Sequence, residues 1–142
     1  MATLSVNTVL GEFRRPNEGS EFQGQLDDVA VVLDADEEHA AAALAQRVST
    51  MVGELAGFAR RSAVELANSF SPEGPGEVEV WETDETVISA AEFARRIRLD
   101  CITAASESDI ELYFDDDGMF GGHTIRVWVD GAGTMTDAQI TG

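Results

Sequence analysis

The fold is decided by residues 29–48, "VAVVLDADEEHAAAALAQRV", because the spacing of the apolar residues changes within this stretch. Val29, Val31 and Leu33 alternate with other residues, and this period of two predicts a strand with one firmly apolar face. Beyond the acid-rich residues 34–38, apolar residues recur at steps of three and four, as they do along one side of a helix. A strand that leads directly into a helix predicts a chain of mixed α and β structure.

The helical spacing predicts one long amphipathic helix over residues 34–70. Its core-facing positions are Leu44, Val48, Met51, Leu55, Phe58, Leu66 and Phe70. Asp34 and Glu37 have the spacing of a capping box at the start of this helix. Gly53 and Gly57 lie inside it, and we expect them to allow close packing on a sheet or a bend. Prolines and glycines follow directly and end the helix.

Strand patterns lie on both sides of this helix. Residues 3–13 and 21–34 predict one strand each, separated by a polar turn. The strand candidates after the helix are residues 77–83, 98–105, 109–115 and 123–130. Short loops join the last three of these candidates, so they predict an antiparallel meander that continues through a further turn to residues 135–142.

A short helix is predicted between these strands. Ser89 and Glu92 form a second capping box, and Phe93 and Ile97 lie on the inner side of the helix that follows. The whole arrangement predicts an α+β fold, in which an antiparallel sheet of the N-terminal strands and the C-terminal meander packs against one long helix and one short helix. The length of 142 residues fits a single domain, 1–142.

Charge is the strongest global property of the chain. It has 27 acidic residues against nine arginines and no lysine, for a net charge of −18. Residues 73–142 hold 16 of the acids and four of the arginines, which is −12 of the total. Such a field repels nucleic acid and anionic membranes, and it speeds association with a basic protein. Solubility alone is the alternative explanation.

The single cysteine, Cys101, excludes an internal disulfide framework and a zinc site built from several cysteines. Its surroundings, "RLDCITAA", predict a small buried side chain rather than a nucleophile. The N-terminal residues have no basic region and no long apolar run, and no segment has the length of a membrane span. A reducing, cytoplasmic location is therefore the expectation.

The stretch "DDDGMFGGH", residues 115–123, is the candidate site for chemistry. Asp115, Asp117 and His123 are the possible ligands of a cation. The calcium-loop pattern fails, because Met119 stands at its fifth position and Arg126 at its twelfth. A transition metal would need more ligands than one histidine and the loop acids. Metal binding by these three residues therefore remains the alternative, and no cofactor is predicted.

Catalysis by the same stretch has little support. His123 could act as a general base, but no nucleophile motif such as G-x-S-x-G and no phosphate-binding glycine loop is present. Gly118, Gly121 and Gly122 are explained by positive φ angles in a tight connection. His123 is in phase with Ile125 and is expected to bond to loop carbonyls or to an aspartate. No catalytic residue is predicted, and the stretch is interpreted as a structured hairpin loop.

The same residues resemble a family of small, mostly bacterial domains of unknown function whose C-terminal half follows a pattern close to "fDDGDLFWGHsI.V….dG.itdA.I.G". The residues that match this motif are Asp115, Asp116, Phe120, Gly122, His123 and Ile125, with Asp137, Ala138, Ile140 and Gly142 near the end. The chain departs from it at Asp117-Gly118, where the order is reversed, and at Gly121, where the family has tryptophan. The resemblance implies a stand-alone bacterial protein. It also implies kinship with proteins suspected to be immunity proteins beside secreted toxins.

These observations together predict a non-catalytic, acidic protein-binding domain of the immunity or antitoxin type, whose partner is a toxin or enzyme with a basic surface. The acids placed at the interface are Glu82, Asp84, Glu85, Asp116 and Asp117. Trp81 and Trp128 are the candidate anchors. Two alternatives remain. One is a small metal-binding protein or metal-dependent hydrolase that uses the 115–123 loop, and the other is an acidic mimic of nucleic acid that inhibits a DNA-binding protein.

Overall fold

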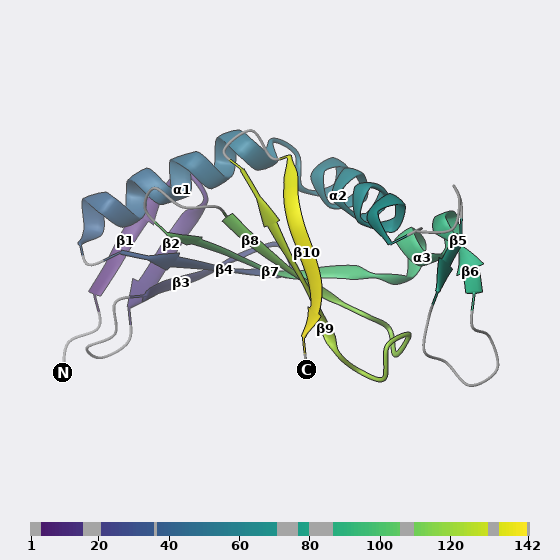
Figure 1. The fold of residues 1–142 in the computed structure, drawn as a ribbon. Helices are drawn as coiled ribbons and strands as arrows, with labels where there is room; N and C mark the ends of the chain where they lie inside the picture. Colours follow the sequence, from purple (N-terminus) through teal and green to yellow (C-terminus); the bar gives the residue numbers. More distant parts are fainter. Residues whose placement is uncertain are drawn as a thin grey trace.

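The structure is a computed structural model, and it describes residues 4–15, 21–35, 37–70, 77–79, 87–105, 110–130 and 134–141. The described strands form an eight-stranded sheet in the order β1-β2-β3-β4-β7-β8-β9-β10 (Figure 1). Its strands are β1 (Leu4–Thr8), β2 (Gly11–Arg15), β3 (Glu21–Leu26), β4 (Val29–Asp34), β7 (Arg98–Ala105), β8 (Ile110–Asp115), β9 (Thr124–Val129) and β10 (Met135–Thr141). A separate two-stranded sheet consists of β5 (Glu77–Glu79) and β6 (Val87–Ser89).

The sheet is mostly antiparallel, but its centre is not. β4 and β7 pair in parallel, from Ala30 opposite Cys101 to Asp34 opposite Ala105. The chain between these two strands includes all three described helices, and a crossover of this kind returns the chain to the end of the sheet at which β4 began. The prediction of an antiparallel sheet is therefore correct for the strand pairs on either side of the β4–β7 pair and wrong for the β4–β7 pair itself.

The two N-terminal strands that the sequence predicts are in fact two hairpins. Residues 3–13 contain a turn between β1 and β2, where the Leu10 N–H donates to the Thr8 hydroxyl at 3.0 Å. Residues 21–34 contain a turn at Asp27, whose φ of 56° is a left-handed conformation that aspartate tolerates. The sequence obscures both turns, because the strand-like residues continue on either side of each turn and no proline stands at either one.

The predicted long helix is also divided. α1 (Glu38–Val52) and α2 (Leu55–Ser69) are separated at Gly53, which has a φ of 62° and donates its N–H to Ser49 O at 2.9 Å. Glu54 then caps α2 by accepting the Gly57 N–H at 3.0 Å. A side chain at Gly57 would place its Cβ 3.0 Å from that carboxylate. The glycine pair therefore ends one helix and starts the next, which is the bend that its spacing allowed.

The capping box predicted at Ser89 and Glu92 has one of its two hydrogen bonds. Ser89 begins α3 (Ala90–Arg96), and its hydroxyl accepts the Glu92 N–H at 3.0 Å. The Glu92 side chain does not complete the box, because it pairs with Arg95 at 2.5 Å. The box at Asp34 and Glu37 is wrong: Glu37 is itself the N-cap of α1 and makes no side-chain cap bond.

α1 and α2 lie along one face of the eight-stranded sheet, whereas α3 lies beyond the end of β7, beside β5 and β6 (Figure 1). Residues that alternate along the strands point into this layer, among them Val31 of β4, Leu112 of β8 and Val127 of β9, and all three are buried. Phe93 and Ile97 are buried, as the helical spacing predicts. The exposed fraction of the intervening strand residues is higher, because no described helix covers the other face, here called the open face.

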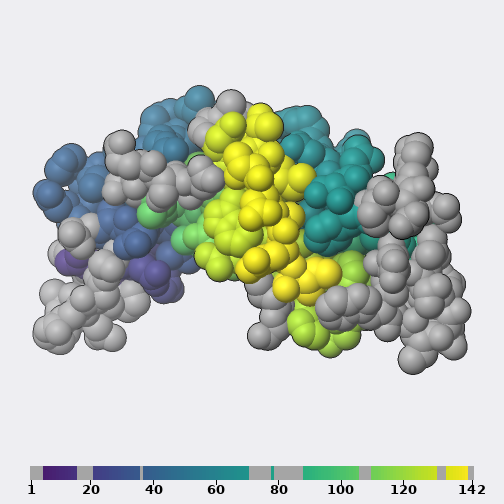
Figure 2. Space-filling view, in the orientation of Figure 1, coloured from purple at the N-terminus to yellow at the C-terminus, as the bar shows by residue number. Residues whose placement is uncertain are grey.

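The C-terminal edge of the sheet also contacts α2. β10 and β9 lie at the surface, with the colours of α1 on one side and of α2 on the other (Figure 2). The Met135 N–H donates to Glu65 Oε1 of α2 at 3.0 Å, which holds the start of β10 against that helix. Among the described residues, no helix is long and apolar enough to cross a membrane.

Candidate functional site

The loop from Asp115 to His123 joins β8 to β9, and the Asp116 carboxylate lies at its centre. Asp116 is 1% exposed and is the one charged residue among the buried described residues. Its Oδ1 accepts the Gly118 N–H at 2.8 Å, and its Oδ2 accepts the N–H groups of Phe120, Gly122 and His123 at 3.1, 3.1 and 2.9 Å. Four backbone donors therefore take the place of water around a buried charge.

The glycines of the loop make this convergence possible. Gly118, Gly121 and Gly122 have φ angles of 78°, 80° and 83°, which few residues with a Cβ adopt. A Cβ at Gly118 or Gly122 would meet nothing within 4 Å. Glycine is therefore needed at these positions for its backbone angle and not because space is short. The expected positive φ angles are confirmed at all three glycines, and they turn successive N–H groups toward one carboxylate.

His123 closes the loop at its far end. Its Nδ1 lies 2.6 Å from the carbonyl oxygen of Phe120, so Nδ1 carries the proton in this bond. The predicted bond of His123 to a loop carbonyl is therefore present, and the side chain is half-buried. Phe120 itself is buried, and its ring centroid lies 6.1 Å from those of Phe70 and Phe93. The contacts of Phe120 with Phe70 and Phe93 pack the loop against α2 and α3.

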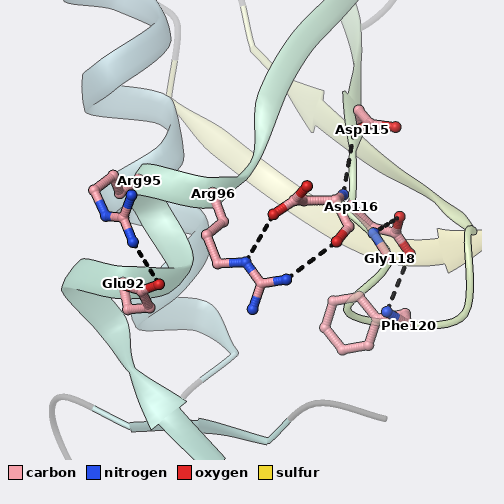
Figure 3. Close-up of polar contacts among 8 residues, drawn as sticks. Glu92, Arg95, Arg96, Asp115, Asp116, Gly118 and Phe120 are labelled. Atoms are coloured by element: carbon pink, nitrogen blue, oxygen red, sulfur yellow. Dashed lines mark hydrogen bonds and ion pairs between the residues drawn. The ribbon is translucent and has the colours of Figure 1, made fainter. Parts of the chain in front are cut away.

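The other two aspartates have partners within the loop and on α3 (Figure 3). Asp115 Oδ2 accepts the Asp117 N–H at 3.2 Å. Arg96 donates through Nε to Asp117 Oδ2 at 2.8 Å and through Nη2 to Asp117 O at 3.1 Å. The neighbouring Arg95 lowers the pKa of the Glu92 carboxyl through their hydrogen bond. The acidic loop is thereby tied to the basic end of α3.

This geometry gives no support to the metal alternative. Asp115, Asp117 and His123 each direct a side-chain atom to a loop or helix partner rather than to a common point. Within the described residues, no group of three or more His, Cys, Asp and Glu side chains is arranged to hold a metal ion. The side chains of these three residues are engaged in contacts within the hairpin and with α3.

A second group of side chains lies on the open face of β8 and β9. It consists of Glu111, Tyr113, Arg126 and Trp128, and we call it the Trp128 cluster. The guanidinium carbon of Arg126 lies 4.6 Å from the ring centroid of Trp128 and 5.9 Å from that of Tyr113. Arg126 also forms an ion pair with Glu111, to which the Tyr113 hydroxyl donates at 3.0 Å.

The electrostatics of the Trp128 cluster follow from these contacts. The bond to Glu111 is the main reason that the pKa of Arg126 is raised. Burial, followed by the hydrogen bond to Glu111, raises the pKa of Tyr113. Burial likewise raises the pKa of the Cys101 thiol, which is half-buried opposite Tyr113 in the sheet register. The phenol and the thiol are thus neutral groups at neutral pH, beside one fixed ion pair.

Two members of the Trp128 cluster, Glu111 and Trp128, belong to a row of residues that crosses the open face. Register places Arg14 of β2 and Gln23 of β3 at one end of the row, and Glu111 and Trp128 near the other. The intermediate members are Val32 and Thr103, and Asp137 of β10 lies beyond Trp128. The row therefore has a cation at one end and an aromatic residue with an acid at the other.

The predicted interface residues are distributed differently. Trp81, Glu82, Asp84 and Glu85 lie outside the described residues. Asp116 is buried and offers no surface to a partner, whereas the Asp117 side chain is 55% exposed beside Arg96. Trp128 is half-buried on the open face.

Sequence reasoning did not identify the companions of Trp128, although the alternation in "IELYFD" and "TIRVWV" places them on one face. Tyr113, Arg126 and Glu111 occupy the positions between the buried residues of β8 and β9. Their mutual contacts depend on the register of the two strands, which the alternation alone does not give.

The chain belongs to the family DUF2262, described as "Uncharacterized protein conserved in bacteria", whose model matches residues 7–140. The matched range includes the 115–123 loop and the Trp128 cluster. Comparison with curated proteins found no match, and comparison with solved structures found none either. The resemblance to a bacterial family of unknown function is therefore confirmed, and the kinship with immunity proteins stays a prediction.

Proposed function

We propose that the protein is a non-catalytic, acidic protein-binding domain of the immunity or antitoxin type, which neutralises a basic toxin or enzyme by covering its surface. The observation that carries this proposal is the Trp128 cluster on the open face of the sheet. Tryptophan, tyrosine and arginine are the residue types most enriched among the residues that dominate binding energy at protein interfaces. Here they contact one another at a place that no described helix covers.

The state of the cluster before binding favours this role. Arg126 is stacked on Trp128 and paired with Glu111, and its side chain is 34% exposed. Its rotamer is therefore largely set in the free protein, so less conformational entropy is lost when a partner covers it. Tyr113 is fixed in the same way by its bond to Glu111.

The net charge favours a basic partner. A charge of −18 attracts a cationic surface over roughly a Debye length, about 8–10 Å at ordinary salt concentrations. This attraction raises the association rate and falls with added salt, whereas contacts at the cluster control dissociation. A cytoplasmic location remains the prediction for such a protein.

The proposal is tested with purified proteins encoded beside its gene, selecting those with a basic surface. Binding to the immobilised chain is measured by surface plasmon resonance at low and high salt. We expect saturable binding whose association rate falls steeply with salt. Arg126→Ala should weaken binding by about 30-fold, the effect of a residue that dominates an interface.

Arg14→Ala is the matched control. Arg14 lies on the open face as well, in the row that contains Glu111 and Trp128, and it is also paired with a glutamate, at 3.1 Å. We expect its replacement to change the dissociation rate little. The proposal fails if no basic protein binds, or if both arginine variants bind as tightly as the native chain. Capture of a DNA-binding protein through its DNA site would instead support the nucleic-acid mimic.

A further inference from the structure

We propose that a cavity between α2 and α3, here called the α2–α3 pocket, binds a small amphiphile with one carboxylate group and an apolar body. The cavity has a volume of about 600 Å³ and lies on the helix side of the sheet, away from the Trp128 cluster. This volume is in the range of small-molecule sites in proteins. The proposal is independent of the protein-binding function, since the two surfaces share no residue.

Small side chains on both helices produce the space. The lining includes Ala59 and Ala63 of α2 and Ala91 and Ala94 of α3. Larger residues at these positions would close the gap between two packed helices. The floor is apolar and includes Leu99 of β7 and Phe114 of β8, both buried in the core. The floor of the pocket thus offers an alkyl chain a surface without polar side chains that would lose their water.

One apolar residue at this pocket is exposed without an apparent structural reason. Val64 lines the pocket, is 48% exposed and is one of two large hydrophobic residues that are exposed in the described part of the chain. It lies beside buried Ala63 on α2. A ligand in the pocket would cover Val64, and the apolar area removed from water would favour binding.

The charges at the rim select the head group. Arg60, Arg95 and Arg98 line the pocket, which is three of the nine basic residues of a chain with a net charge of −18. Arg95 is paired with Glu92 and Arg98 with Asp100, at 2.5 and 3.3 Å. Within the residues that the structure describes, Arg60 has no such partner.

The acids at the rim are Asp27 and Asp28, which come from the turn between β3 and β4. They disfavour a ligand with several negative charges but are compatible with a ligand that has a single negative charge. A single carboxylate paired with Arg60 therefore fits the rim, whereas a phosphate or a nucleotide fits it less well.

Isothermal titration calorimetry of the full chain with decanoate, kept below its micelle concentration, tests the proposal. We expect one saturable site and a higher melting temperature in the presence of decanoate, because the ligand binds only the folded state. Decyltrimethylammonium, which has the same alkyl chain and the opposite charge, should not bind at this site. Absence of heat with decanoate, or equal binding of both amphiphiles, would overturn the proposal.

Three variants locate the site. Arg60→Gln should reduce the affinity for decanoate by at least about tenfold, the effect of losing a charge-assisted bond. Arg61→Gln is the matched control, because Arg61 is the next residue of α2 and does not line the pocket. Ala59→Leu should abolish binding by filling the cavity, with circular dichroism checking that the variant is folded. Equal affinity in the two arginine variants would refute the proposed head-group contact.

Light scattering distinguishes the other occupant, a second copy of the chain. We expect the same molecular mass for the native chain and for Ala59→Leu, because the ligand and not another subunit fills the pocket. A native dimer that Ala59→Leu converts to a monomer would overturn the proposal.

Discussion

The two faces of the eight-stranded sheet are formed by the same strands, but different interactions hold the side chains of each face in place. On the helix-covered face, Leu112 and Val127 are buried by packing alone. On the open face, their neighbours Tyr113 and Arg126 are held by a hydrogen bond, an ion pair and ring contacts. The first face stabilises the fold, and the second keeps side chains in place where a partner can reach them. Each experiment below tests this division.

The largest effect is expected on the covered face. Leu112→Ala should lower the free energy of unfolding by about 3 kcal/mol, because it removes a fully buried side chain and leaves a cavity. Tyr113→Ala, one residue away on the open face, should lower it by only about 1 kcal/mol. Urea denaturation of both variants gives the comparison. Equal losses would mean that the open face is covered in solution.

Asp116 is a charged residue that is buried, unlike the other charged residues that the structure describes. Asp116→Asn keeps the size of the side chain but replaces one accepting oxygen with a donor, which leaves backbone N–H groups without a partner. We expect a loss of about 2 kcal/mol in the free energy of unfolding. Asp115→Asn is the control, since its carboxylate accepts one backbone N–H, at 3.2 Å, and should cost about 0.5 kcal/mol. A similar loss in both variants would contradict the central role of Asp116.

A smaller effect on stability is expected within the Trp128 cluster. Arg126→Gln removes the ion pair with Glu111 and the stacking on Trp128, and its side chain is partly exposed to water. The free energy of unfolding should therefore fall by less than about 1 kcal/mol. Thermal unfolding measures it. A loss as large as that of Leu112→Ala would show that the cluster supports the fold and would weaken its assignment to binding.

The smallest effect concerns the ionisation of Tyr113, the one tyrosine of the chain. Burial and Glu111 raise its pKa above the ordinary value of 10.0 in the folded protein. The folded state then keeps its proton where the unfolded state has lost it, so stability falls as the pH rises from the unfolded pKa to the folded pKa. Absorbance near 295 nm follows the phenolate, and the control Glu111→Gln should move the pKa back toward 10.0. An ordinary pKa in the native chain would contradict the described bond.

The parts of the fold that local spacing controls could be predicted from the sequence. Residues 98–105 form the strand that their alternation predicts, and Ser89 caps α3. The break at Gly53 could be anticipated as a bend and not as two helices, because the apolar spacing continues across it. The parallel pairing of β4 and β7 has no local signal at all, since it joins residues far apart in the chain.

The same limit applies to the candidate site. The positive φ angles of the glycines and the bond of His123 follow from local rules, and both are present. Three successive aspartates have nearly the same local surroundings, so the sequence does not show that Asp116 alone is buried. Only the folded loop decides which carboxylate its N–H groups surround.

The parallel seam between β4 and β7 has a consequence for how the protein folds. On each side of the seam, successive strands pair with their neighbours in sequence, so each half needs only short loops to close. The seam needs the closure of the long segment that carries all three helices, and contacts of such high sequence separation form slowly. We expect two hairpin-rich halves to form early and the β4–β7 hydrogen bonds to complete the sheet. Pulse-labelled amide exchange during refolding would then show protection in β8 and β9 before protection at the seam.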